Sequence, residues 1–214
     1  MNASKAAVAA ALLAATVAGC GGGDEGSSAT SGGGSARTLT VYSSLPLQGA
    51  SRGQATAISN GMKLALEQVG GKVGDYTIKY ESLDDSSAQA GAWTPEATSA
   101  NARKVVQDKS AIAYLGEFNS GASAVSIPLL NEAGVPQNGL TNTAVGLTTN
   151  QPGSNPGEPD KYYPTGKRNS VRIVPKDTIQ GVALVTLMKQ DGCTKVFVLN
   201  DKEARAPTAW SMPG

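Results

Sequence analysis

The chain has 214 residues and carries 18 basic and 17 acidic side chains, which gives a net charge of +1 at pH 7. This balance gives no support for nucleic-acid binding, which needs a concentrated basic face. Histidine is absent and only two cysteines are present, so the usual general base and the usual ligands of a metal cluster are missing. We therefore expect no catalytic residues, no metal and no cofactor.

The first 20 residues have the features of a secretory signal peptide. Lys5 supplies a positive charge, and residues 6–18 are apolar apart from Thr16. This run is shorter than the roughly 20 residues that a membrane-spanning helix needs. It ends in Val17-Ala18-Gly19-Cys20, which resembles a lipobox, so we expect Cys20 to be the site of lipid attachment. The alternative is an ordinary signal peptide with an incidental cysteine.

Residues 21–37 are predicted to be a flexible tether. Nearly every residue from Gly21 to Ser35 is Gly, Ser, Ala, Thr or acidic, and such a stretch buries too little apolar surface to fold. A coil of this length would hold the following domain about 20 Å from a membrane. If Cys20 is lipidated, Cys193 is left unpaired, and its place at a turn before an apolar run favours a structural thiol over a reactive one.

From residue 38 onward, stretches typical of strands alternate with stretches typical of helices. Apolar and β-branched runs predict strands at 38–45, 76–83, 111–116 and 195–199, with shorter extended stretches ending near 140 and spanning 171–174. Apolar spacing predicts helices at about 58–69, 95–106, 121–133 and 177–190, the second capped by Thr94-Pro95 and the last by Asp177. A long loop rich in proline and glycine occupies 141–169.

This alternation predicts an α/β fold, in which a parallel, doubly wound sheet carries helices on both faces. In such sheets, ligands bind beyond the carboxyl ends of the strands. We therefore expect binding residues in three loops, at 46–51, 117–120 and 140–143.

Short motifs in and between these loops are quite specific when their order and spacing are taken together. They are Leu45-Pro46-Leu47-Gln48-Gly49, Gly61-Met62-Lys63-Leu64-Ala65, Tyr114-Leu115-Gly116-Glu117-Phe118-Asn119-Ser120-Gly121, Gly134-Val135-Pro136, Thr141-Asn142-Thr143 and Arg172-Ile173-Val174-Pro175-Lys176-Asp177. Over residues 39–201 the chain thereby resembles the substrate-binding proteins of branched-chain amino acid ABC transporters. That resemblance implies a leucine/isoleucine/valine-binding-like protein with the type I, two-lobed periplasmic-binding fold.

The resemblance also assigns ligand contacts. In that family, a serine after the third strand and a threonine-containing loop after the fourth hold the ligand's α-carboxylate and amino group. These positions correspond to Ser120, Thr141 and Thr143, with Asn119 and Gln48 as weaker candidates. Ser120 is placed to cap a helix whose free N–H groups and positive dipole end would face an anion. The alternative is that Ser120 is a plain N-cap and that the threonines are ordinary turn residues.

The domain organisation implied by the resemblance is incomplete. Residues 38–169 correspond to the N-terminal lobe, and residues 170–201 to the crossover and the start of the second lobe. Chains of the family continue much further, whereas residues 202–214 have two prolines and neither a helical face nor a strand pattern. We expect this tail to be foreign to the fold, as the result of a frameshift or a truncated gene product.

The favoured function is the extracytoplasmic substrate-binding component of an ABC importer for amino acids or similar small carboxylates. It would be lipid-anchored on the outer face of the cytoplasmic membrane or in the periplasm, with an ABC permease and ATPase as partners. The alternatives are a ligand-sensing lobe of a receptor system or a non-functional truncated relic. Enzyme motifs with a nucleophile elbow or a phosphate loop are absent.

Other polar and aromatic residues have weaker claims to a role. Carboxylates occur in pairs at Asp84-Asp85 and at Glu158 and Asp160, but carboxylates in polar loops are usually solvated, so we do not expect acid–base catalysis. Trp93 and Tyr114 are candidates for lining the cleft, although aromatic residues near strand ends more often pack in the core.

Overall fold

The computed structural model describes residues 37–199 and contains a six-stranded sheet with the strand order β2-β3-β1-β6-β7-β8. The strands are β1 Arg37–Leu45, β2 Lys72–Val73, β3 Tyr76–Asp84, β6 Ala111–Gly116, β7 Gln137–Gly139 and β8 Ser170–Arg172. Only β2 runs antiparallel to its neighbour, and all other neighbouring strands of this sheet are parallel. The predicted α/β fold with a mostly parallel sheet is therefore confirmed.

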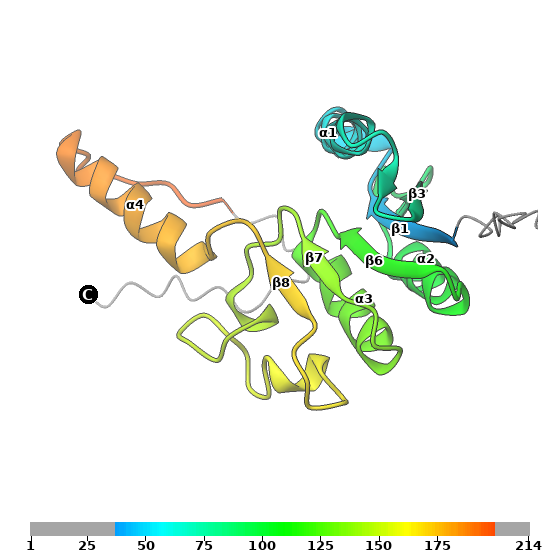
Figure 1. Cartoon of the computed structure of the whole chain (residues 1–214). Helices are drawn as coiled ribbons and strands as arrows, with labels where there is room; N and C mark the ends of the chain where they lie inside the picture. Colours follow the sequence, from blue (N-terminus) through cyan, green and yellow to red (C-terminus); the bar gives the residue numbers. More distant parts are fainter. Residues whose placement is uncertain (1–36, 200–214) are drawn as a thin grey trace, which may run out of the picture. The chain divides into compact units, whose positions relative to one another are not determined.

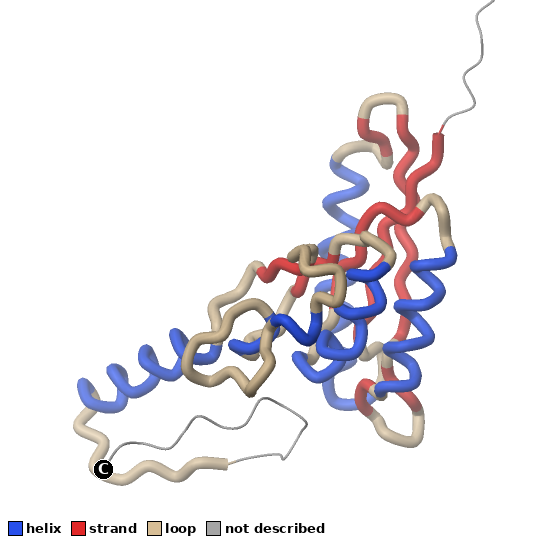
Figure 2. The backbone as a smooth tube through the Cα atoms, turned by 90° about the horizontal axis from the view of Figure 1, so that it is seen from below, coloured by secondary structure: helices blue, strands red, loops and turns tan. Residues whose placement is uncertain are grey.

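Helices cover both faces of the sheet. The covering helices are α1 Arg52–Gln68, α2 Pro95–Gln107 and α3 Ser120–Glu132, whereas α4 Asp177–Gln190 extends away from the sheet. Figure 1 shows α1 on one face and α2 with α3 on the other, and Figure 2 shows the same strands, in red, between helices, in blue. Crossovers between parallel strands are right-handed, so the direction of travel along the sheet decides which face a helix covers. The chain moves from β1 to β3 on one side of β1, and then to β6 and β7 on the other side, so the connecting helices lie on opposite faces.

Local sequence explains where the elements begin. The Thr94 hydroxyl accepts a hydrogen bond from the Ala97 N–H at 3.2 Å, and Pro95 supplies the first helical residue of α2, as predicted. The predicted strand at 111–116 coincides with β6. At α4, the N-cap position is taken by Lys176 rather than by the predicted Asp177, which is the first residue of the helix.

The core consists of two clusters. Tyr42, Val105, Tyr114 and Leu130 are buried together between the sheet and the paired helices α2 and α3. A second cluster joins α3 to the long segment between β7 and β8, and its members are Ile127, Ala144, Leu147, Tyr162 and Tyr163. This segment contains two short 3-10 helices, at Val145–Leu147 and Asp160–Tyr162, so the predicted loop is packed onto the fold.

Three expectations about individual segments require correction. Residues 195–199 form no strand, and Phe197 and Leu199 are 85% and 86% exposed, because no described strand lies beside them. Cys193 is exposed and is therefore not a packed structural thiol. A hairpin of β4 Ser86–Ser87 and β5 Ala92–Trp93 follows β3, where the sequence predicted only a polar loop.

Parts of the predicted organisation lie outside the described residues. These are the signal peptide with Cys20, the tether up to residue 36, and the tail at 202–214. Within residues 37–199, no helix combines the length and the apolar character that crossing a membrane requires.

Candidate ligand-binding site

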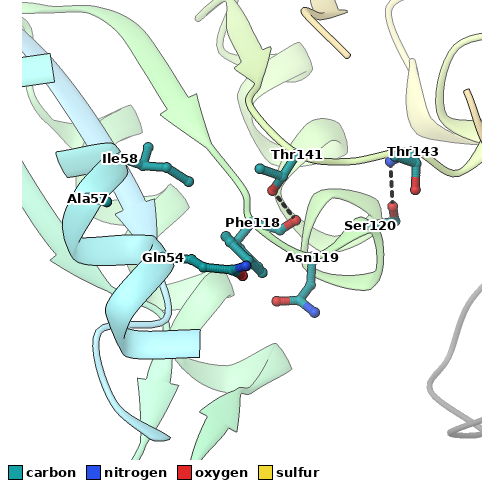
Figure 3. Close-up of a pocket in the computed structure, with 8 residues that line it drawn as sticks. All are labelled: Gln54, Ala57, Ile58, Phe118, Asn119, Ser120, Thr141 and Thr143. Atoms are coloured by element: carbon teal, nitrogen blue, oxygen red, sulfur yellow. Dashed lines mark hydrogen bonds between the residues drawn. The ribbon is translucent and has the colours of Figure 1, made fainter. Parts of the chain in front are cut away.

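A hollow of about 530 Å³ lies at the carboxyl ends of the central strands. It is lined by Gln54, Ala57, Ile58, Phe118, Asn119, Ser120, Thr141 and Thr143. Figure 3 shows the three residues of α1 on one side and the residues that follow β6 and β7 on the other. The connections from β1 and β6 leave on opposite faces of the sheet, and this divergence opens a crevice at the strand ends.

Ser120 lies on the side of the hollow away from α1, next to Thr143. Its hydroxyl oxygen accepts hydrogen bonds from the backbone N–H groups of Thr143 and Ala144, both at 3.2 Å. The N-cap position of α3 is Asn119, so Ser120 is the first residue of the helix and does not cap it as the sequence suggested. Because two N–H groups occupy its two acceptor positions, the remaining capacity of this hydroxyl is to donate a proton.

Thr141 and Thr143 approach from the segment after β7. The Thr141 hydroxyl donates to the backbone carbonyl of Phe118 at 2.6 Å, which leaves its oxygen able to accept a further hydrogen bond. The Thr143 backbone is held on both sides, because its N–H donates to Ser120 and its carbonyl accepts from the Asp177 N–H at 3.0 Å. The structure thus brings the loops after β6 and β7 together at the hollow.

Asn142 connects these two loops, a role that its sequence position alone did not indicate. Its side-chain amide is buried and donates to the carbonyl of Glu117 at 2.6 Å and to the hydroxyl of Ser123 at 2.7 Å. A β-carbon on Gly139 would lie 2.0 Å from the Asn142 side-chain oxygen, so glycine is needed for this close approach.

The apolar side of the hollow was also missed. Gln54, Ala57 and Ile58 lie on successive turns at the start of α1, and Phe118 faces them from the loop after β6. The loops at strand ends were the expected binding residues, whereas this wall comes from a helix.

Other candidates lie elsewhere. The side-chain amide of Gln48 donates to Asp84 at 2.7 Å, and Gln48 does not line the hollow. Tyr114 is fully buried in the core, and Trp93 belongs to the small hairpin.

The carboxyl groups near the site are not solvated as expected. Asp85 and Glu117 are fully buried, and their two carboxyls lie close enough to interact with each other. Burial raises the pKa of both carboxyls, and the charge of Asp85 adds to the rise at Glu117. The Tyr114 hydroxyl donates to the other oxygen of Glu117 at 2.5 Å. This pair lies behind the loop that presents Ser120 and not in the hollow.

Glu158 is also buried, at 7% exposure. Burial alone would raise the pKa of this carboxyl, but hydrogen bonds from Tyr162 and Asn155 lower it to about 2. Its role is to fold the segment between β7 and β8, while Asp160 stays exposed and pairs with Arg168.

The electrostatic field in the hollow favours an anion. None of its lining residues among those described carries a charge. The N-terminus of α3, a helix of 13 residues, begins at Ser120, and the free N–H groups of its first turn carry partial positive charge. A carboxylate placed here would meet the Ser120 hydroxyl and this helix end together.

Comparison with known proteins identifies the family and the fold. A family model described as periplasmic binding protein matches residues 39–209, which is most of the chain. A search of curated proteins returned no significant match.

Solved structures with similar folds are solute-binding proteins of ABC transporters. One from R. palustris in complex with 4-hydroxybenzoate has a TM-score of 0.58 at 20% identity, over 72% of this chain and 36% of that one. Another from R. palustris, in complex with benzoate, has a TM-score of 0.56 at 23% identity, over 72% and 38% of the two chains.

A third is the branched-chain amino acid transporter substrate-binding protein of Streptococcus pneumoniae in complex with isoleucine. Its TM-score is 0.52 at 19% identity, over 66% of this chain and 35% of that one. The chain thus spans little more than a third of the length of these proteins and corresponds to one lobe of their fold.

Proposed function

Because the chain belongs to the periplasmic binding protein family, we propose that it binds a small carboxylate in the hollow and supplies it to an ABC importer. The proposal covers amino acids and aromatic acids. Similar structures hold isoleucine, benzoate and 4-hydroxybenzoate.

The observation that carries the proposal is the hydrogen bonding of Ser120. Its hydroxyl accepts from Thr143 and Ala144 and therefore offers a proton to a ligand. The N-terminal end of α3 adds partial positive charge at the same place. A ligand that presents an anionic oxygen uses both features, and a neutral ligand uses only the first.

The rest of the hollow supports an apolar body on that carboxylate. Ala57 and Ile58 on α1 and Phe118 on the facing loop offer apolar surface, and Gln54 adds one amide. Hydroxyls and backbone amides hold a carboxylate without the strength of a bidentate arginine, which suits a protein that must release its ligand to a transporter. This combination favours binding and release over chemical conversion of the ligand.

The location and the partners follow from the same proposal. The protein would work outside the cytoplasmic membrane, attached through a lipid on Cys20, and would deliver its ligand to a permease that an ATPase drives. Labelling with a radioactive fatty acid in cells tests the anchor. Incorporation that Cys20→Ala abolishes supports it, and label in both forms or in neither contradicts it.

Ligand-dependent thermal stabilisation tests the binding proposal. The full chain is heated with isoleucine, leucine, benzoate or 4-hydroxybenzoate at millimolar concentration, each beside the carboxamide that replaces its carboxylate. We expect at least one carboxylate to raise the melting temperature by a degree or more and its amide to have a smaller effect. Equal effects of acid and amide, or no effect of any acid, would contradict the proposal.

A further inference from the structure

Arg172 makes an unusual set of contacts at the end of β8. Its guanidinium donates to the carbonyl of Ala144 at 2.9 Å, to those of Asn142 and Val145 at 3.5 Å, and to the Thr148 hydroxyl. All four acceptors belong to the single segment that carries Thr143 into the hollow. Arginine's planar fork suits such multiple contacts, whereas a lysine ammonium is a point charge without this geometry.

This positive charge has no close carboxylate among residues 37–199. The ion pairs of that part of the chain do not include Arg172. The side chain is half-buried, and burial lowers its pKa, which the more distant charge of Asp177 partly offsets. Burying part of a cation that only neutral acceptors satisfy costs free energy. With no counter-ion close by among residues 37–199, the field of Arg172 acts mainly on the surrounding peptide groups.

The contact with Asn142 leads directly to the hollow. The Asn142 carbonyl and the Thr143 N–H belong to one peptide group, and that N–H donates to the Ser120 hydroxyl. A positive charge at the carbonyl end polarises the peptide and strengthens donation from its N–H end. The polarised Ser120 hydroxyl is in turn a better donor to a ligand.

We infer that Arg172 is a positioning residue for carboxylate recognition: it fixes segment 142–148 and, through the Asn142–Thr143 peptide, makes Ser120 a stronger donor. The inference rests on the proposed function, and it places a whole positive charge behind a hollow whose walls carry none. Arg172 would thus favour a carboxylate over the corresponding amide without touching the ligand.

The first experiment measures selectivity. Nuclear magnetic resonance titrations of the full chain compare benzoate with benzamide, and isoleucine with isoleucinamide, for the wild type and for Arg172→Gln. We expect Arg172→Gln to weaken acid binding by about tenfold and amide binding by less than about threefold. Arg172→Lys should recover part of the selectivity, because it keeps the charge. If Arg172 only holds segment 142–148 in place, acid and amide should lose equal affinity, and that result would overturn the inference.

Arg168→Gln is the matched control. Arg168 is an exposed arginine of the same region that pairs with Asp160 and stacks on Tyr163, and it makes no hydrogen bond to segment 142–148. Its loss should leave acid-to-amide selectivity unchanged. A selectivity change as large as that of Arg172→Gln would show a general charge effect and would overturn the inference.

The second experiment needs no ligand and separates this inference from the proposed function. Amide hydrogen exchange at Thr143 and Ala144 should accelerate at least about tenfold in Arg172→Gln and remain unchanged in Arg168→Gln. If the wild type binds none of benzoate, benzamide, isoleucine and isoleucinamide, the proposed function fails. Unchanged exchange at Thr143 and Ala144 in Arg172→Gln overturns the positioning role by itself. If Arg172→Gln does not fold, Arg172→Lys takes its place in the exchange experiment, because it removes the planar fork, and faster exchange is expected at the same two amides.

Discussion

Two hydroxyl groups in the hollow use their hydrogen-bonding capacity in opposite ways. Ser120 accepts two backbone N–H groups and can donate, whereas Thr141 donates to the Phe118 carbonyl and can accept. An α-amino acid, which carries both a carboxylate and an ammonium group, would use both residues. An aromatic acid such as benzoate would use Ser120 alone.

The substitution Thr141→Val therefore separates the two ligand classes. It keeps the shape of the side chain and removes the acceptor, so isoleucine should bind several-fold more weakly while benzoate is affected less. Calorimetric titration of both ligands with both proteins measures the difference. Equal losses for isoleucine and benzoate would mean that Thr141 acts only by holding the loop.

The buried carboxyls Asp85 and Glu117 predict that stability depends on pH. Both pKa values are raised in the folded state, that of Asp85 to about 6. The contribution of the two carboxyls to folding stability is therefore complete below their ordinary pKa values near 4, and it is lost as the pH rises through the raised values. Groups such as Glu158, with a lowered pKa, act in the opposite direction at lower pH. A comparison of variants is therefore needed to isolate the pair.

Glu117→Gln removes one ionisable group of the pair and keeps an acceptor for the Tyr114 hydroxyl. Between pH 5 and 8 the wild type should lose on the order of 1–3 kcal/mol of unfolding free energy relative to this variant. Urea unfolding at several pH values measures it, with Glu132→Gln, an exposed carboxylate on α3, as the control. Parallel pH profiles of the wild type and Glu117→Gln would refute the assignment.

At the scale of elements, local sequence predicted what local interactions decide. The strand at 111–116 and the start of α2 at Thr94-Pro95 follow from burial pattern and capping. The apolar run at 195–199 has strand composition but no neighbouring strand in the described part of the chain, and an unpaired strand does not form. The hairpin after β3 was missed because its two strands have only two residues each.

The site was predictable only in part for the same reason. Ser120, Thr141 and Thr143 follow strand ends, where α/β folds place their binding loops, and all three line the hollow. The α1 wall depends on the direction in which that helix crosses the sheet, which residue spacing does not specify. The burial of Asp85 likewise arises from packing between separate loops, so its polar neighbours in sequence gave no sign of it.

One contact within the segment between β7 and β8 leaves no room for a side chain at Gly146. A β-carbon on Gly146 would lie 1.7 Å from the Glu158 carboxylate, which is itself held by Asn155 and Tyr162. Gly146→Ala should therefore cost about 2 kcal/mol or more in unfolding free energy. Urea unfolding measures the cost, and a loss below about 0.5 kcal/mol would show that the segment adapts freely.

Gly61 provides the control for that substitution. It lies exposed within α1, and an added β-carbon there meets no other atom within 4 Å. Gly61→Ala should raise the unfolding free energy by about 0.5–1 kcal/mol, because alanine is the better helix former. Opposite signs for the two substitutions distinguish the tight contact from a general effect of replacing glycine.

At the scale of the whole molecule, the notable feature is exposed apolar surface on α4. Ile179, Val182 and Leu187 are 56%, 68% and 52% exposed, although a helix with apolar residues around its circumference is normally buried. The similar structures are much longer than this chain, which spans little more than a third of them.

We expect the 214-residue chain to self-associate through this helix. Sedimentation velocity should show a mass that rises with concentration, and the double substitution Val182→Glu and Leu187→Glu should reduce the association. The same double substitution should leave the melting temperature of the chain within a few degrees of the wild-type value, since neither side chain is buried. A wild type that stays monomeric at all concentrations would contradict the expectation.

The most direct test of carboxylate binding in the hollow is a titration of the isotopically labelled chain with benzoate and with isoleucine, followed by nuclear magnetic resonance. The account predicts that at least one ligand shifts the amide signals of Ser120, Thr143 and Ala144 most strongly, together with those of Gln54 and Ile58 across the hollow. Ser120→Ala should abolish those shifts. Saturable shifts centred on other residues, or shifts that persist in Ser120→Ala, would contradict it.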